Sequence, residues 1–289
     1  MLWLTLSLMT ALAAATQDTW IKKHFSHLGA YQMTAFPLFY SLPFFMLTAV
    51  FIPRPPLDST YYTCLLACLP INALAILLYM RAIRSSPLSL TIPYLAFTPV
   101  FMLATGLFVL NESPNPWGIT GIVFTCVGSY ILNIEPGEQH IAGPIKAIFR
   151  EEGSRLMLLV AFLFSLAAVI GKKGILHSSV LFFTVSFFAL FALCMSVLMI
   201  TLGKAPLRDL ARRPLSGLAA GILLYLHAIC HGYAISMVQA AYMISIKRLS
   251  ILFSIIYGKL VFKESNVRIR FLGACWMLAG AIVIVMYGT

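Results

Sequence analysis

Two stretches of the chain decide its fold: residues 106–128, GLFVLNESPNPWGITGIVFTCVG, and residues 258–280, GKLVFKESNVRIRFLGACWMLAG. They align without a gap when the sequence is shifted by 152 residues (258 − 106), and the longer segment 82–132 then falls on 234–284. Glycines and one Glu-Ser pair coincide in a single register. A hydrophobic unit that occurs twice is typical of membrane transporters built from two structural repeats.

The composition indicates that the solvent of this chain is lipid. It has 289 residues, of which 61% are hydrophobic and only 10% are charged, whereas soluble proteins carry about 25% charged residues. The net charge of +11 does not point to nucleic acid, because lysine and arginine collect in the cytoplasmic loops of membrane proteins. We therefore expect the lipid bilayer as a partner and no nucleic acid.

Apolar runs long enough to cross a bilayer, about 20 residues each, occur ten times. Backbone groups in lipid must be hydrogen-bonded internally, so these runs are predicted to be helices. The first run has no basic segment before it and is read as a helix, not a signal peptide. The predicted helices cover residues 2–17, 30–52, 60–80, 88–110, 116–134, 155–173, 178–202, 214–234, 238–262 and 268–287.

The ten helices divide into two homologous sets of five. Because five is odd, the two sets must insert with opposite orientation, which predicts an all-α membrane protein with an inverted 5+5 repeat. The predicted units are residues 1–134 and 155–289. Residues 135–154 between them begin with turn-forming residues and end in a short amphipathic segment, which we expect to lie at the membrane interface as a linker.

The distribution of lysine and arginine predicts the orientation. Loops after odd-numbered helices carry fourteen of these residues, against three, Arg54, Lys172 and Lys173, after even-numbered helices. Positive loops stay in the cytoplasm, so both termini are predicted to lie outside. The expected location is the inner (plasma) membrane of the cell, spanned many times.

Glycines recur with a spacing of seven residues near the end of each half, at Gly121 and Gly128 and at Gly273 and Gly280. Seven residues are close to two helical turns, so both glycines of a pair share one face. Glycine on such a face lets another helix approach closely, and we expect these positions to serve packing.

Two prolines interrupt the predicted helix 88–110. Pro93 and Pro99 have Ser245 and Ile251 as their repeat counterparts. Proline lacks the N–H that a helix interior needs, so it kinks or breaks a helix. The sequence therefore predicts a kink in the fourth helix that the ninth does not share.

Ionisable residues at membrane depth are the main functional candidates, because each costs about 2.5–3.5 kcal/mol to insert at a helix centre. Lys247 and Arg248 lie well inside the predicted helix 238–262, and their repeat counterparts are the apolar Leu95 and Ala96. We predict that the pair binds a substrate bearing a carboxylate or another anionic group. The alternative is that both side chains extend to the membrane interface.

Other polar residues complete the predicted site. His227 and His231, four apart, share one helix face; packing is the alternative reading for both. No acid accompanies them, so no metal site and no cofactor are predicted. Glu112 and Glu264 are expected to fix turns or cap the next helix. The predicted substrate-binding residues are Lys247, Arg248, His227, Asn72, Tyr94 and Tyr242, and the predicted coupling residues are Asp18 and His231.

The repeated ending, with Phe262-Lys-Glu264 followed by Gly273 and Gly280, resembles the EamA-type drug/metabolite transporter superfamily. Leu166-Ala-Ala-Val-Ile-Gly-Lys-Lys is similar to the sixth helix of bacterial members. The resemblance implies ten helices as an inverted repeat, alternating access, and a cavity lined by helices one, three, four, six, eight and nine. It also implies cytoplasmic termini, in conflict with the charge distribution.

Lys247-Arg248-Leu-Ser also resembles the ninth helix of plastid triose-phosphate translocators, where such a pair holds the substrate phosphate. Their additional basic residue in helix four has no equivalent in residues 88–110. The resulting prediction is a secondary transporter, not an enzyme, for a small polar metabolite, with amino acids, organic acids and sugar phosphates as candidates. A lipid or lipid-carrier flippase and an integral membrane enzyme are the alternatives. A monomer or homodimer is expected.

Overall fold

The computed structural model describes residues 1–85, 92–132, 151–204, 213–262 and 268–288. Within these ranges all regular structure is helical and no strand occurs, so the predicted all-α class is confirmed. The predicted interfacial linker falls largely on residues 133–150, outside the described residues. Its last residues, 152–154, instead begin a long helix.

The ten predicted segments correspond to thirteen helical elements. Those of the first half are α1 (Leu2–Phe25), α2 (Ala30–Phe51), α3 (Ser59–Ser85), the 3₁₀-helix η1 (Ile92–Phe97), α5 (Thr98–Leu110) and α6 (Pro116–Leu132). Those of the second half are α8 (Glu152–Leu176), α9 (Val180–Thr201), α11 (Pro214–Met237), α12 (Ala240–Lys247), α13 (Ser250–Phe262), α14 (Arg268–Val283) and a final π-helical turn, η2 (Ile284–Gly288).

Among the described residues, six helical segments are long and apolar enough to cross a membrane by length and composition. Three more apolar helices are shorter, at 94–110, 116–132 and 272–288. The first helix, Leu2–Phe25, is in neither group; its second half carries Gln17, Asp18 and two lysines. The chain is thus a multi-pass membrane protein.

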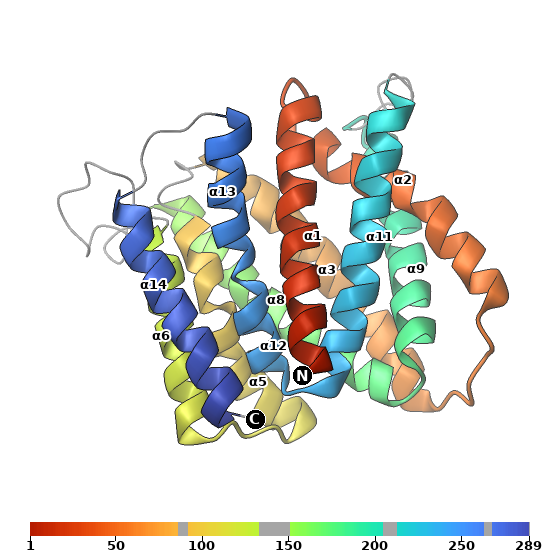
Figure 1. The fold of residues 1–289 in the computed structure, drawn as a ribbon. Helices are drawn as coiled ribbons and strands as arrows, with labels where there is room; N and C mark the ends of the chain where they lie inside the picture. Colours follow the sequence, from red (N-terminus) through yellow and green to blue (C-terminus); the bar gives the residue numbers. More distant parts are fainter. Residues whose placement is uncertain (86–91, 133–150, 205–212, 263–267, 289) are drawn as a thin grey trace.

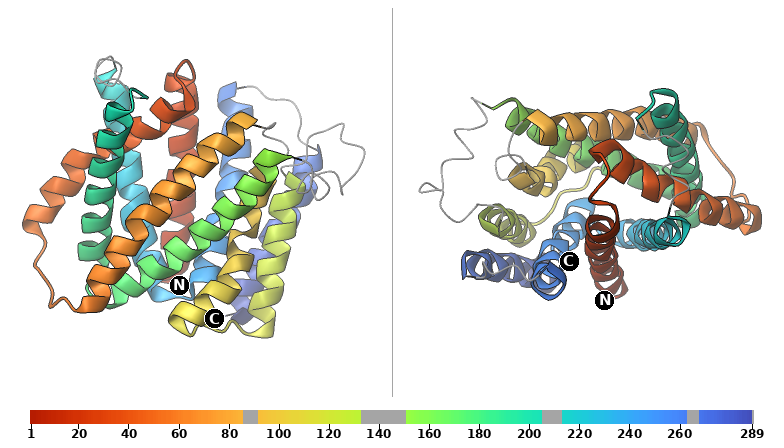
Figure 2. Two further views of the ribbon diagram at one scale, coloured as in Figure 1. Left: turned by 180° about the vertical axis from the view of Figure 1, so that it is seen from behind. Right: turned by 90° about the horizontal axis from the view of Figure 1, so that it is seen from above.

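The helices form one bundle with a pair at each end (Figures 1 and 2). Helices α6 and α14 pack against each other at one end, and α2 packs against α9 at the other. Between them, α1 contacts α11 and α3 contacts α8. Both termini lie at the same face of the bundle, the lower face in Figure 1.

Helices α3 and α8 run antiparallel and are joined at both ends. At one end, Asp58 accepts a hydrogen bond from the backbone N–H of Tyr61 at 2.9 Å and so caps α3. Its other oxygen lies 2.6 Å from Nδ1 of His177 at the end of α8. The hydrogen bond from the Tyr61 N–H, and after it the smaller effect of His177, hold the pKa of Asp58 below its usual range. At the far end, Arg81 pairs with Glu152 at 2.6 Å.

The fourth and the ninth predicted helices are both interrupted, whereas the sequence predicted an interruption in the fourth alone. The fourth segment changes from the 3₁₀-helix η1 to the α-helix α5 between Phe97 and Thr98. The ninth is interrupted between Lys247 and Ser250, where α12 ends and α13 begins. Since 250 − 98 = 152, the breaks are repeat equivalents, although only the first contains proline. The expectation that the interruption is not shared was wrong, because a helix can also break where polar side chains face a cavity.

The glycine pairs do serve close packing, as predicted, and they pack on each other. A Cβ atom added to Gly128 would lie 2.6 Å from the carbonyl oxygen of Gly273, and one added to Gly121 would lie 2.7 Å from that of Gly280. The reverse contacts, from Gly273 and Gly280, are equally short, at 2.7 and 2.5 Å. The backbones of α6 and α14 therefore touch at two levels, and this contact joins the two halves of the chain.

We expect Gly128→Ala to destabilise the protein by about 1–3 kcal/mol, because the new methyl group can be accommodated only if two helix backbones separate. The loss is measured as a lower midpoint of thermal unfolding in detergent. Gly171→Ala on α8 is the matched control, since its Cβ would approach no atom closer than 3.8 Å. Equal midpoints for Gly128→Ala and the wild type would contradict the described contact.

Candidate functional site

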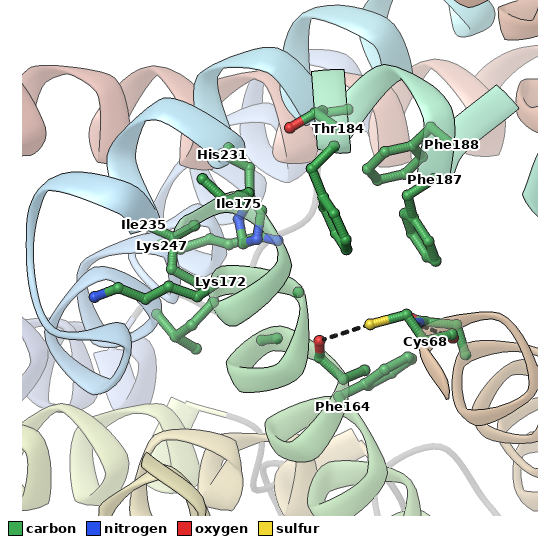
Figure 3. Close-up of a pocket in the computed structure, with 18 of the residues that line it drawn as sticks. Cys68, Phe164, Lys172, Ile175, Thr184, Phe187, Phe188, His231, Ile235 and Lys247 are labelled. Carbon is green, nitrogen blue, oxygen red and sulfur yellow. Dashed lines mark hydrogen bonds between the residues drawn. The ribbon is translucent and has the colours of Figure 1, made fainter. Parts of the chain in front are cut away.

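A cavity of about 320 Å³ lies in the middle of the bundle. Six helices contribute to its lining: α3, α5, α8, α9, α11 and α12. Figure 3 shows the side chains of Lys247 and His231 on one side of this space and those of Phe187 and Phe188 on the other. Of the predicted site residues, Lys247, Arg248, His227, His231 and Asn72 line it.

The two adjacent cations lie at the break between α12 and α13. Arg248 donates a hydrogen bond from Nη2 to Oγ1 of Thr98, the first residue of α5, over 2.7 Å. Its Nε atom is buried and has no hydrogen-bond partner among the described residues. Lys247 forms no hydrogen bond or ion pair with a described residue. The side chains of Lys247 and Arg248 are both half-buried. The break in one half is thus tied directly to the break in the other.

Few charges compensate this pair. No aspartate or glutamate belongs to the cavity lining among the described residues. The carboxylate of Asp18 on α1 is close enough to interact electrostatically with Lys247, but Asp18 does not line the cavity. Tyr79 on α3 lies within electrostatic reach of both Asp18 and Arg248. One carboxylate therefore faces two cations.

The two histidines lie parallel on α11, with ring centroids 6.2 Å apart and an interplanar angle of 10°. Both Nδ1 atoms are buried without a hydrogen-bond partner among the described residues, so each is available to a ligand. Asn72 already donates a hydrogen bond from Nδ2 to the carbonyl of Cys68 on its own helix, over 2.8 Å. Its amide nitrogen is therefore already engaged by the backbone.

The two predicted tyrosines lie elsewhere. Tyr94 is fully buried and packs in a cluster with Ala82, Met157 and Val160. Tyr242 is also buried, and its ring fills the space beside Gly118. Neither lines the cavity, so their placement gives no support to a role in substrate binding.

A buried ion pair that sequence reasoning missed borders the cavity. Lys172 on α8 donates hydrogen bonds to Oε1 of Glu112 and to the carbonyl of Val238. The other oxygen of Glu112 accepts from the backbone N–H of Ala240 at 2.8 Å. Glu112 thus caps α12, a helix of the other half. Of its two predicted roles, fixing its turn or capping the next helix, the second is wrong. Lys172 was assigned to a loop but lies inside α8 and lines the cavity; Glu264 is outside the described residues.

The repeat contains the signal that would have found Lys172. Leu12-Ala13-Ala14 of the first half matches Leu166-Ala167-Ala168 of the second, a shift of 154 residues. The same shift places Asp18 on Lys172. The first helix of each half therefore carries one ionisable residue at an equivalent position, with opposite charge, and both residues lie near the cavity.

Comparison with known proteins agrees with this architecture. Residues 1–134 match the family model described as the EamA-like transporter family. This half is similar to the EamA-like transporter family. The resemblance inferred from the glycine-spaced helices and the Glu-Ser turns is confirmed for these residues.

Among solved structures, 29 chains match this protein. One, described only as the crystal structure of a protein, superposes with a TM-score of 0.73 at 11% sequence identity and covers 98% of each chain. At this identity the likeness concerns the fold alone. No curated protein matches the sequence. Among the described residues, no group of three or more His, Cys, Asp and Glu residues is placed to hold a metal ion.

Proposed function

We propose that this EamA-like chain is a secondary transporter that moves a small polar anion by alternating access. The observation that carries the proposal is the position of Lys247 and Arg248 at a helix break, beside a cavity whose described lining contains no carboxylate. Cations in such a site are costly unless an anion compensates them. A bound carboxylate or phosphate supplies that compensation, and an arginine can hold either in a bidentate manner.

For alternating access we propose the inverted 5+5 arrangement, with units 1–134 and 155–289. In the repeat, α1 is equivalent to α8, α3 to α11, and α5 to α13. The contact between α1 and α11 should therefore have a counterpart between α8 and α3, and the contact between α1 and α13 a counterpart between α8 and α5. All four contacts are present. The pairs α6–α14 and α2–α9 map onto themselves. The equivalent breaks at Thr98 and Ser250 agree with the same relation. This is the contact pattern expected of a two-fold pseudosymmetric transporter.

For orientation we propose that both termini face outward from the plasma membrane. Because Lys172 is a cavity residue, the bias between loops after odd-numbered and even-numbered helices becomes fourteen basic residues against two, instead of fourteen against three.

For coupling we propose Asp18, whose carboxylate lies within electrostatic reach of Lys247, with His231 as the second proton-carrying candidate. The cavity volume of about 320 Å³ favours a single small solute over a lipid with two acyl chains.

The test is counterflow in liposomes that contain the purified protein. Vesicles loaded with an unlabelled small anion should accumulate the same labelled anion transiently, because an alternating-access carrier exchanges internal for external substrate. Vesicles without protein are the control. Uptake of cationic or neutral solutes only, across a panel of carboxylates and phosphate esters, would contradict the proposal.

A further inference from the structure

The cavity has two chemically different ends. Most of the basic groups come from α11, α12 and the break after α12, together with Lys172 of α8; Lys247, His231 and Lys172 lie on one side in Figure 3. The opposite side is formed by phenylalanine rings, labelled Phe187 and Phe188 in the figure, with Phe164 below them. Four phenylalanines line the space in all: Phe164 on α8 and Phe183, Phe187 and Phe188 on α9.

The rings of α9 form an ordered wall. Phe187 lies parallel to Phe183, with centroids 6.3 Å apart and an interplanar angle of 6°. Phe188 meets Phe187 edge to face at 5.1 Å and 78°. Phe183 is buried, whereas Phe187 and Phe188 are only half-buried and border the cavity. Phe187 also stacks on Phe191, at 5.5 Å and 13°, and Phe188 stacks on Phe45, at 5.4 Å and 11°. A bound molecule therefore meets the ring edges and the parts of the ring faces that these contacts leave uncovered.

This arrangement favours a particular shape of ligand. Apolar ring surface beside a hydrated cavity is unfavourable unless an apolar group covers it. Aromatic rings gain a further preference for other rings, through offset-stacked or edge-to-face contact, beyond what the covered area supplies. A volume of about 320 Å³ lies at the small end of ligand pockets, which span roughly 300–1,000 Å³; it suits one ring and a short polar part.

We propose that the substrate is an aromatic anion: its negative group binds at Lys247 and Arg248, and its ring packs on Phe187 and Phe188. This inference rests on the proposed anion transport and adds the class of the substrate. The unpaired Nδ1 atoms of His227 and His231 line the same cavity and are available to a second polar group on the substrate.

The test uses three probes that share a carboxylate and differ in the body: 3-phenylpropionate, 3-cyclohexylpropionate and propionate. Their affinities are measured by equilibrium dialysis with protein in nanodiscs of neutral lipid. We expect 3-phenylpropionate to bind most tightly and propionate most weakly, with a roughly two- to tenfold advantage of the phenyl over the cyclohexyl probe for each ring contact. Phe187→Leu and, separately, Phe188→Leu should remove that advantage.

Phe162→Leu is the matched control, because Phe162 lies on α8 two residues before Phe164, is 40% exposed and does not line the cavity. It should leave all three affinities unchanged. Equal affinities for the phenyl and cyclohexyl probes, or an undiminished phenyl advantage in both monodisperse leucine variants, would overturn the aromatic inference. Arg248→Gln separates the two claims: if it weakens all three probes the anion site stands, and if it weakens none the proposed function fails.

Discussion

Exchange of the anion is expected to fall at least tenfold in Arg248→Gln and to a similar extent in Lys247→Gln. A hydrogen bond to a charged group contributes about 1.5–3 kcal/mol, which corresponds to roughly 10- to 150-fold in binding. Arg248 also holds Thr98 at the start of α5 through its Nη2 atom. Removing it therefore loosens the contact between the two helix breaks as well as the anion site. The measurement is the initial rate of counterflow at low substrate concentration.

Two further variants make this result specific. Arg248→Lys should retain part of the activity, because lysine keeps the charge but loses the planar fork that reaches both Thr98 and the anion. Lys259→Gln removes a positive charge from α13 at an exposed position and should transport normally. Wild-type rates in both Lys247→Gln and Arg248→Gln would show that the pair only sets the depth of the helix.

The second large effect is expected at the buried ion pair. The side chains of Lys172 and Glu112 are 7% and 15% exposed, and removing one partner of a buried pair costs about 3–5 kcal/mol because the other charge is left uncompensated. Glu112→Gln should therefore lower the thermal unfolding midpoint strongly. The glutamine can still accept the N–H of Ala240, so the cap of α12 is not the cause of the loss.

The double variant Glu112→Gln/Lys172→Met separates the ion pair from its surroundings. Both charges are then absent, and we expect much of the lost stability to return, with a coupling energy that a double-mutant cycle measures. Additive losses in the two single variants and the double variant would mean that the two residues do not act as a pair.

The sequence predicted the helical segments well because continuous apolar runs leave the backbone no alternative in lipid. It also predicted the role of Gly121 and Gly128, since a seven-residue spacing fixes one helix face. It did not predict that α12 ends at Lys247. That break has no proline, and its marking contact is a hydrogen bond from Arg248 to Thr98, a residue 150 positions away in the sequence.

The candidate site was predicted in part. Lys247, Arg248 and the histidines were found because polar residues in apolar helices are conspicuous. Lys172 was missed because its position near the end of an apolar run resembles a loop residue; its match to Asp18 in the repeat and its buried partner Glu112, from the other half, show otherwise. The phenylalanine wall could not be predicted, because in a chain with 21 phenylalanines nothing in the sequence distinguishes those that line a cavity.

The central claim is that the cavity selects a negative charge. The most direct measurement is the binding of three matched probes, 3-phenylpropionate, 3-phenylpropionamide and 3-phenylpropylammonium, to the protein in neutral-lipid nanodiscs. We expect saturable binding of the carboxylate, at least tenfold tighter than the amide, competition by inorganic phosphate, and no binding of the ammonium. Binding of the amide or the ammonium as tight as that of the carboxylate would contradict it.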